Sequence, residues 1–356
     1  MISRHTWLLF VSLAGCSSPH DFVTPHEDAA AVDAQAAVAP TNDASFAPID
    51  ASDAKVTQCQ APPNAVDPQY VTIAAKYAAD YTAYDLGPVP GVDSYLLGGC
   101  VIAYDDPNTL YVAVASETTT GAIYAVPLVR EPCGHIVGFA GPATLVASTP
   151  YVDANLIYGP NDVLFYSMWP VDELSELLPN QSAPSYTAAL SSINVGGGGP
   201  GGIGFVPPNL SDPGGLRAVT WPSGYWYHLT YSSQQQTYAI TSAAQQPGST
   251  LPNGPGGFAY VPAGSPQFAK QSIITAEWPG PAVAVYEVDS MGDPIVSSRD
   301  EFFTQFPKPW GAYFEPATGD FMFLSWGGGN DADAGGADEI YIVQGFTKPP
   351  PPPTPK

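Results

Sequence analysis

The apolar positions of the chain fall in short runs that are separated by turns rich in Gly and Pro. Runs such as Thr109–Val114 and Ala122–Val126 mix β-branched, aromatic and small residues. Such runs are typical of β-strands. The chain has 35 glycines and 40 prolines among 356 residues, and both residues destabilise helix interiors. The pattern therefore predicts an all-β chain.

One pattern recurs five times along the chain. An apolar, Gly-rich run ends in an aromatic residue that a proline closely follows, and successive aromatic residues are 54, 47, 55 and 54 positions apart. These residues are Tyr104, Tyr158, Phe205, Tyr260 and Phe314. Two or three further strand-like runs follow in each repeat, and four strands in about 50 residues are typical of a β-propeller blade. We predict a β-propeller with five four-stranded blades; six is the alternative, if residues 67–98 form another.

The last repeat ends after its third strand-like run, Ile340–Val343. We expect the run Tyr70–Tyr77 to supply the missing strand and so to close the ring, because closure removes two open sheet edges. Outer strands are expected at Thr237–Thr241 in the third repeat and at Pro294–Ser297 in the fourth.

The first 15 residues are typical of a targeting signal, with Arg4 before the short apolar run Trp7–Val11. The sequence Leu-Ala-Gly-Cys that ends at Cys16 resembles the lipobox of bacterial lipoproteins. This resemblance implies cleavage before Cys16, a lipid on that cysteine and a lipid bilayer as partner. Because Ser17 follows, it also implies an extracytoplasmic protein of the outer membrane. An ordinary secretory signal with an unrelated cysteine is the alternative.

The composition predicts two polar tails around the repeats. Residues 16–66 are rich in Ala, Asp and Pro and lack hydrophobic periodicity, so we expect a disordered tether. Residues 67–347 hold the propeller, and residues 348–356 form a Pro-rich tail.

Several segments resemble a family of secreted bacterial β-propeller proteins of undefined activity, many of which carry PEP-CTERM sorting signals. The resemblance rests on Gly256–Pro266, Val285–Asp289, Gly292–Pro294 and Gly311–Asp320. It implies the propeller fold but no catalytic residue. This chain differs in having a lipobox and no C-terminal sorting helix.

The net charge and the cysteine content indicate which partners to exclude and which cellular compartment to expect. The net charge of −23 would repel a phosphate backbone, which excludes nucleic acid as a partner. We expect a monomer. With Cys16 lipidated, three cysteines remain for disulfide bonding in an oxidising compartment. We prefer a bond between Cys100 and Cys133; Cys59 with either of them is the alternative.

A tryptophan recurs at the end of the second strand in repeats two to five. These residues are Trp169, Trp221, Trp278 and Trp326, and the first repeat has Ala115–Glu117 in their place. The loops there are expected on the face of a propeller where ligands usually bind. The four rings are either an aromatic platform for a ligand or wedges packed between blades.

One acidic loop is a candidate calcium site. It contains Asn330, Asp331, Asp333, Asp338 and Glu339 among glycines. Calcium takes six to eight oxygen ligands and tolerates flexible loops. The alternative is a loop without metal, and calcium is the one candidate cofactor.

Two classes of function agree with these features. The first is a non-catalytic, surface-anchored propeller that binds a glycan, a small ligand or a protein through its loop face. The second is an extracytoplasmic hydrolase or lactonase-type enzyme that uses carboxylates at the channel mouth. Glu277, Asp172 and Glu173 lie beside the recurring tryptophans, but no motif fixes their separation, and we assign no catalytic residue.

Overall fold

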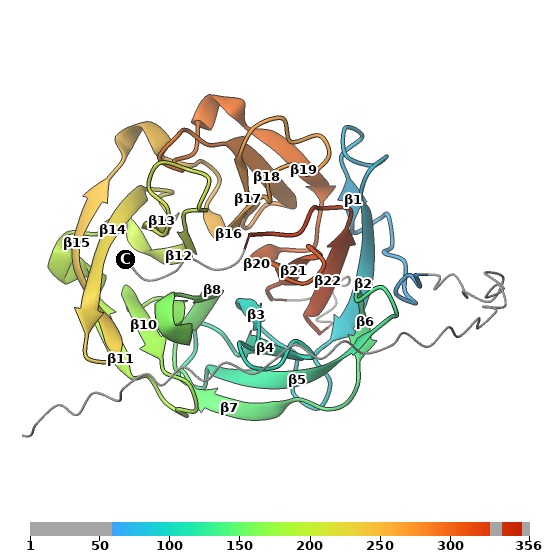
Figure 1. Ribbon diagram of the computed structural model, residues 1–356, viewed down its shortest axis with the longest axis horizontal. Helices are drawn as coiled ribbons and strands as arrows, with labels where there is room; N and C mark the ends of the chain where they lie inside the picture. Colours follow the sequence, from blue (N-terminus) through green and yellow to red (C-terminus); the bar gives the residue numbers. More distant parts are fainter. Residues whose placement is uncertain (1–58, 328–336, 351–356) are drawn as a thin grey trace, which may run out of the picture. The chain divides into compact units, whose positions relative to one another are not determined.

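The computed structural model describes residues 59–327 and 337–350. In this part of the chain the strands form five antiparallel sheets, which are arranged as blades around a ring (Figure 1). The predicted all-β propeller of five blades is therefore confirmed. Residues 67–98 do not form a sixth blade, because their strands belong to the last two blades.

Blade 1 has an innermost strand, two central strands and a divided outer edge. Both β6 and β7 pair with β5, so that the long third strand serves two partners. The strands are β3 (Cys100–Ile102), β4 (Thr109–Val114), β5 (Ala122–Arg130), β6 (Ile136–Phe139) and β7 (Thr144–Ser148).

Blades 2, 3 and 4 each follow the chain outward from the ring centre (Figure 1). Blade 2 contains β8 (Val152–Tyr158), β9 (Leu164–Met168), β10 (Glu173–Leu177) and β11 (Tyr186–Ala189). Blade 3 contains β12 (Gly198–Phe205), β13 (Leu216–Pro222), β14 (Trp226–Gln234) and β15 (Thr237–Gln245). Blade 4 contains β16 (Pro255–Tyr260), β17 (Ser272–Glu277), β18 (Ala282–Glu287) and β19 (Asp300–Gln305). Short 3-10 turns lie at Pro160–Asp162, Leu190–Ile193, Pro247–Ser249 and Val296–Ser298.

The ring is closed by a strand from the N-terminal side, as predicted, but a different strand does it. Blade 5 contains β20 (Pro309–Phe314), β21 (Phe321–Ser325) and β22 (Glu339–Gln344), and β2 (Thr82–Pro88) completes it by pairing with β22. The run expected there instead gives β1 (Thr72–Ile73), which pairs with β19 on blade 4. Tyr77, at the end of that run, and Tyr81, just before β2, pack against Phe302 on β19. Burial of these rings holds the segment between β1 and β2 beside the seam.

The expected outer strand at residues 294–297 is also wrong. That stretch ends in a 3-10 turn, and the outer strand of blade 4 is β19. Phe302 and Phe303 are both fully buried on β19, whereas Ile295 is 37% exposed. Burial of two phenylalanines therefore decides which segment pairs with β18.

The preferred disulfide is wrong, and the structure joins Cys59 to Cys133. Cys100 is a free, buried cysteine on the innermost strand of blade 1, whereas Cys133 lies in the turn after β5. Two strand spacings of about 4.8 Å separate these strands, which is beyond the reach of a disulfide. The N–H of Gln60 donates to Glu131 Oε2 at 3.0 Å and holds Cys59 beside that turn.

Residues 59–66, which the sequence places at the end of the tether, contact the propeller. Besides the disulfide, Ala65 forms a bridge with Tyr84 on β2. The N-terminal segment thus contacts blades 1, 5 and 4 in turn. Cys16, most of the tether and the end of the Pro-rich tail lie outside the described residues.

Candidate functional site

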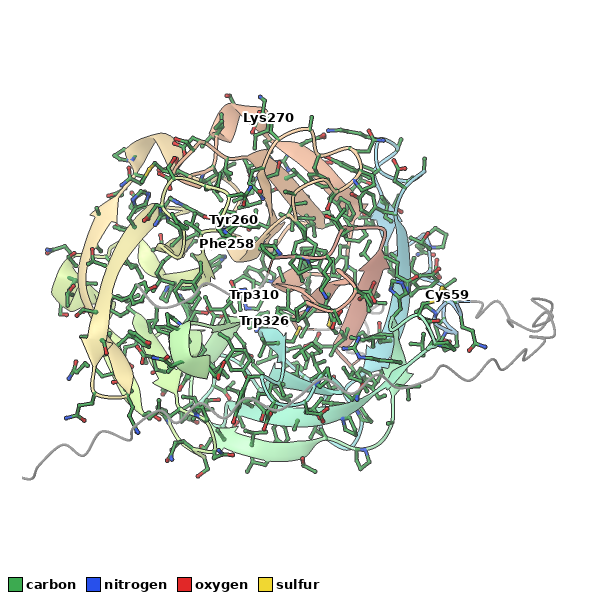
Figure 2. All side chains as sticks on the ribbon, in the orientation of Figure 1. Cys59, Phe258, Tyr260, Lys270, Trp310 and Trp326 are labelled. Atoms are coloured by element: carbon green, nitrogen blue, oxygen red, sulfur yellow. A yellow bond between two sulfur atoms is a disulfide. The ribbon has the colours of Figure 1, made fainter. Side chains whose placement is uncertain are left out.

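A cavity of about 160 Å³ opens near the ring axis on one face of the propeller. We call it the tryptophan cup. Figure 2 shows Trp310 and Trp326 near the centre of the ring. The cup is lined by five indole rings and one carboxyl group: Glu117, Trp169, Trp221, Trp278, Trp310 and Trp326.

The four tryptophans predicted from the repeat meet in this cup because of strand register. Each lies at the end of the second strand of its blade, which pairs with the start of the innermost strand. Glu277, just before Trp278, pairs with Pro255, and Ser325, just before Trp326, pairs with Pro309. Since innermost strands surround the axis, residues at these ends converge.

The rings pack against one another in a chain around the cup. Trp169 and Trp221 have centroids 5.3 Å apart, Trp221 and Trp278 are 5.5 Å apart, and Trp278 and Trp326 are 5.4 Å apart. All three contacts are edge-to-face, a favourable geometry for aromatic pairs. The four rings are half-buried. They are neither flat exposed platforms nor wedges in separate blade interfaces; a shared cavity joins them.

Trp310 is the fifth ring and comes from a different kind of position. It lies on β20, the innermost strand of blade 5, is 3% exposed, and has its ring centroid 6.0 Å from those of Trp278 and Trp326. A Cβ on Gly256 of the neighbouring innermost strand would lie 2.7 Å from Trp310 Cε3. The glycine therefore provides the room that this indole occupies.

A pair of carboxyl groups lies at the side of the cup. The indole N–H of Trp310 donates to Asp153 Oδ1 at 2.8 Å, and Asp153 is fully buried. The carboxyl of Glu117 lies close enough to Asp153 for their charges to interact, and Asp153 Oδ2 is buried without a hydrogen-bond partner among the described residues. The N–H of Glu117 donates to the carbonyl of Val152 at 2.9 Å, which holds its backbone next to Asp153.

Burial changes the protonation of this pair. It raises the pKa of Glu117 to about 7. Burial and the nearby Glu117 charge raise the pKa of Asp153 well above its ordinary value. Two neighbouring carboxyl groups that are shielded from water do not both ionise easily, so their burial favours a pair that keeps a proton.

Asn155 on β8 bonds to the innermost strands of other blades. Its Oδ1 accepts from the N–H of Ile203 at 3.1 Å and of Phe258 at 3.3 Å, and its Nδ2 donates to the carbonyl of Ala312 at 3.2 Å. These bonds join the innermost strands of four blades. Asn155 is 1% exposed, so it links these strands in the buried interior of the ring.

Sequence reasoning missed Glu117, Asp153 and Trp310 as site residues. A signal existed for Glu117, because it belongs to the segment Ala115–Glu117 that stands in the first repeat where the other four have a tryptophan. The other innermost strands contain no tryptophan or aspartate, so the repeat does not draw attention to Trp310 or Asp153. Nothing in the sequence indicates that these two residues, 157 positions apart, are bonded.

The carboxylates considered from the sequence are placed differently. Glu277 is 2% exposed and accepts hydrogen bonds from Arg299 Nε at 2.9 Å and Arg299 Nη2 at 2.6 Å. Its other partners are Tyr286 and Asn253. Glu277 is therefore held in an ion pair beside the cup, while Asp172, in the turn before β10, and Glu173, the first residue of β10, are half-buried.

The candidate calcium loop is described only in part. Asn330, Asp331 and Asp333 lie outside the described residues. Asp338 is fully buried and accepts from the N–H of Gly327 at 3.0 Å, and Glu339 accepts from the hydroxyl of Tyr341 at 2.7 Å. Calcium binding at this loop stays a prediction.

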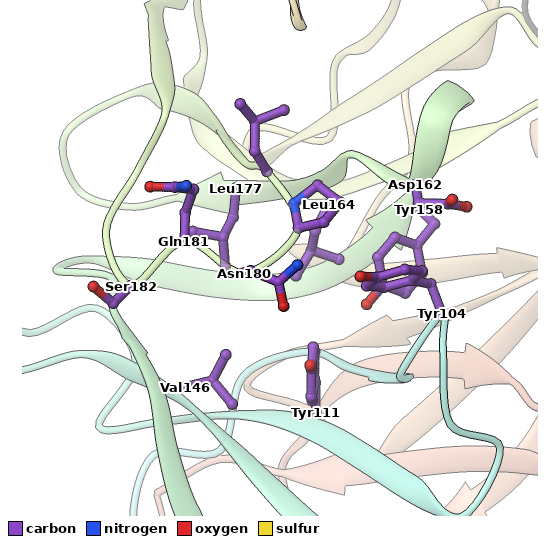
Figure 3. A pocket seen from close by; sticks show the side chains of 12 residues that line it. Tyr104, Tyr111, Val146, Tyr158, Asp162, Leu164, Leu177, Asn180, Gln181 and Ser182 are labelled. Atoms are coloured by element: carbon purple, nitrogen blue, oxygen red, sulfur yellow. The ribbon is translucent and has the colours of Figure 1, made fainter.

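A second cavity, of about 180 Å³, lies between blades 1 and 2 (Figure 3). Tyr104 and Tyr158, two of the recurring aromatic residues, line it with ring centroids 5.9 Å apart. The recurring Phe205 and Tyr260 line a third cavity, of about 170 Å³, together with Pro349 and Pro350 from the Pro-rich tail. The recurring aromatics thus end the innermost strands, opposite the tryptophan cup.

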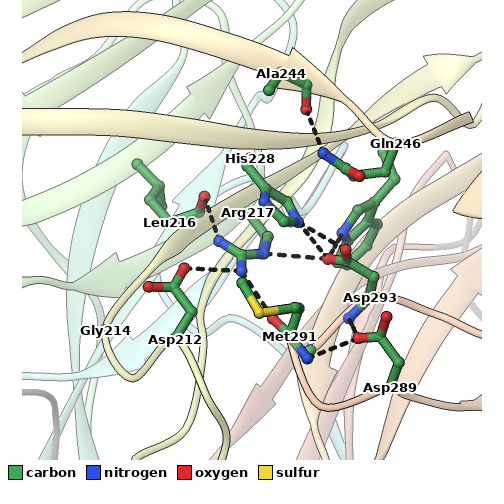
Figure 4. A network of polar contacts seen from close by, with 12 residues as sticks. Asp212, Gly214, Leu216, Arg217, His228, Ala244, Gln246, Asp289, Met291 and Asp293 are labelled. Carbon is green, nitrogen blue, oxygen red and sulfur yellow. Dashed lines mark hydrogen bonds and ion pairs between the residues drawn. The ribbon is translucent and has the colours of Figure 1, made fainter.

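A network of charges joins blades 3 and 4 (Figure 4). Arg217 donates to Asp212 at 2.9 Å and to Asp293 at 3.3 Å, and His228 Nε2 lies 2.6 Å from Asp293 Oδ1. Burial opposes ionisation of Asp293, but the hydrogen bonds from His228 and Trp226 and the Arg217 charge outweigh it and lower its pKa. Asp293 belongs to the Gly292–Pro294 motif, whose role in this chain is to join two blades.

Comparisons with known proteins concern the fold alone. No protein-family model and no curated protein sequence matches this chain. The PQQ-bound aldose sugar dehydrogenase from Streptomyces coelicolor is similar with a TM-score of 0.39 and 13% identity, over 73% of this chain and 83% of that one. An auxiliary nutrient binding protein from Bacteroides ovatus is similar with a TM-score of 0.41 and 11% identity, over 74% and 76%. A virginiamycin B lyase from Staphylococcus aureus is similar with a TM-score of 0.35 and 13% identity, over 77% and 79%. Nothing about the site of this chain follows from these similarities.

Proposed function

We propose that this protein is a non-catalytic propeller that binds a small ligand in the tryptophan cup. The observation that carries the proposal is the convergence of five indole rings and the Glu117 carboxyl on one cavity of about 160 Å³. A cavity of about 150 Å³ is large enough for a benzene-sized group. Four half-buried tryptophans on a water-facing surface are also costly unless a partner covers them.

Tryptophan fluorescence provides the test, because the ligand would contact the reporting rings. The full chain is titrated with a panel of sugars, small apolar molecules and organic cations. We expect at least one class to change the emission saturably, and Trp278→Ala to abolish that change. The control is Tyr104→Ala, which alters the second cavity. If no class binds, or if binding survives Trp278→Ala, the proposal is overturned.

We further propose that the propeller is anchored outside the cytoplasm by a lipid on Cys16. The lipobox-like sequence supports this. Among the described residues, no helix combines the length and the apolar character that crossing a membrane requires. The substitution Cys16→Ser should move the protein from the membrane fraction to the soluble fraction, since a lipid contributes about 0.8 kcal/mol per buried CH₂. Membrane association that persists in this variant would contradict the anchor.

A hydrolytic activity is the second candidate, and the Glu117–Asp153 pair is the observation that favours it. A cavity-lining carboxyl with a pKa near neutrality is suited to general acid–base catalysis. A panel of lactones and glycosides tests this candidate, with Glu117→Gln as the variant. Turnover lost in Glu117→Gln would support an enzyme, whereas binding without turnover supports the first proposal.

A further inference from the structure

Among the described residues, the side chains that line the tryptophan cup provide a carboxyl group and aromatic surface but no positive charge. None of the described side chains that line it is basic, and the Glu117–Asp153 pair is the charged feature at its wall. A buried carboxylate is costly unless a cation or several hydrogen-bond donors compensate it. The indole N–H of Trp310 donates to Asp153 Oδ1, whereas Asp153 Oδ2 is buried without a hydrogen-bond partner among the described residues.

Indole rings complement this charge. A cation over an aromatic face is attracted by the ring quadrupole, and tryptophan gives the strongest attraction of the aromatic side chains. Aromatic cages of this kind recognise alkylated ammonium groups. The net charge of −23 for the whole chain also favours the approach of a cation.

The hydrogen-bonding groups of the tryptophan cup favour a quaternary cation over a sugar as the ligand. The Nε1 atoms of Trp221, Trp278 and Trp326 are buried and have no hydrogen-bond partner among the described residues. A Cβ added to Gly254 would lie 2.9 Å from Trp221 Nε1, so that nitrogen faces the loop of Gly254. Because these nitrogens are buried and Glu117 is the one carboxyl among the lining residues, a sugar ring with several hydroxyls would leave some of them unpaired in the cup, which is costly. A quaternary ammonium group makes no hydrogen bonds and loses none.

We propose that the tryptophan cup binds a quaternary trimethylammonium group, with the indole rings around its methyl groups and Glu117 as its counter-charge. This inference rests on the proposed function, because it names the ligand class of the same site. The cavity of about 160 Å³ matches a group of this size, since a cavity of about 150 Å³ accepts benzene.

Choline and its neutral carbon isostere, 3,3-dimethylbutan-1-ol, test the charge directly. The two have the same shape, and calorimetry on the full chain compares their affinities. We expect choline to bind at least about tenfold more tightly. Equal affinities would overturn the inference yet leave the proposed function intact, because the cup would still bind a small group. No choline binding would also overturn it, and the fluorescence panel would then decide the proposed function independently.

Site variants assign the effect to named residues. Glu117→Gln keeps the shape and removes the charge, and should weaken choline binding about tenfold while leaving the isostere unchanged. Tyr104→Ala, in the second cavity, should change neither affinity. Unchanged choline binding in Glu117→Gln would contradict its role as counter-charge.

The pH dependence of choline affinity provides a second test of the role of Glu117. Asp153 is the titratable group that interacts with Glu117, and the other described side chains that line the cup are tryptophans. A cation stabilises the ionised carboxyl, so choline affinity should rise from about pH 5.5 to about pH 8 and release protons on binding. Glu117→Gln should flatten this rise. A flat profile in the natural sequence would count against the inference.

A vesicle assay distinguishes a lipid headgroup from a free small molecule as the carrier of the trimethylammonium group. Sedimentation with phosphatidylcholine vesicles, but not with phosphatidylglycerol vesicles, would identify a lipid headgroup as the ligand, provided that Trp278→Ala abolishes it. Choline binding without vesicle binding would identify a free small molecule. Both results support the chemistry that we propose.

Discussion

Trp310 on blade 5 donates its indole N–H to Asp153 on blade 2, at 2.8 Å and across 157 positions of the sequence. The bond joins the innermost strands of two blades that are not neighbours in the ring. It positions the buried indole of Trp310 against the rings of Trp221, Trp278 and Trp326 and orients the Asp153 carboxyl, whose charge interacts with that of Glu117. Loss of this bond should therefore affect both stability and the cup.

Replacement of Trp310 by Phe should lower the free energy of unfolding by about 1–3 kcal/mol beyond the loss of ring area, because Asp153 loses its donor. Urea denaturation measures this difference. The matched control is Trp326→Phe, since the Nε1 of Trp326 has no hydrogen-bond partner among the described residues. Equal losses in the two variants would mean that the bond to Asp153 contributes little.

Replacement of Glu117 by Gln should change how stability depends on pH. The pKa of Glu117 is about 7 in the folded protein, against 4.5 for an ordinary glutamate. Between these values the unfolded chain has lost the proton that the folded chain keeps, so stability falls as pH rises and levels off above about 7.

The Gln variant lacks this titration. Its stability relative to the natural sequence should therefore be greater at about pH 8 than at about pH 4. Thermal melts across this range provide the measurement, with Asp105→Asn, at an exposed position, as a surface control. A stability difference that does not vary with pH would show that Glu117 is not the buried acid.

Removal of the disulfide should destabilise the whole domain. The bond between Cys59 and Cys133 closes a loop with a sequence separation of 74. Chain-entropy arguments give a contribution of about 4 kcal/mol for such a loop. Cys133→Ala should lower the melting temperature, whereas Cys100→Ala keeps the bond. Peptide mapping under non-reducing conditions checks the pairing, and a Cys100–Cys133 peptide would contradict the structure.

Closure of the ring should depend on the buried face of β2. Ala83 is buried and Thr82 is exposed, although they are adjacent on that strand. Ala83→Glu would bury a charge at the β2–β22 pairing and should cost more than about 3 kcal/mol, whereas Thr82→Glu should change stability by less than about 0.5 kcal/mol. Calorimetry should show one cooperative transition that is lowered as a whole. A separate early transition for blade 5 would indicate that closure does not support the other blades.

The sequence by itself determined the repeat and therefore the blades. Local strand patterns at a period near 50 residues predict one supersecondary unit per repeat, because each unit encodes its own strands and turns. The recurrence of Trp169, Trp221, Trp278 and Trp326 also indicated one face of the propeller, since equivalent positions in a ring share a face.

Tertiary structure decided which residues meet across the ring. Trp310, Asp153 and Glu117 come from different blades, and closure of the sheet ring alone brings them together. The pairing of Cys133 was decided by strand order, which separates Cys100 from it by two strands. The closing strand was decided by burial of Tyr77, Tyr81 and Phe302, which is a non-local gain. Local pattern specifies the units, whereas contacts between distant units depend on packing that no single repeat encodes.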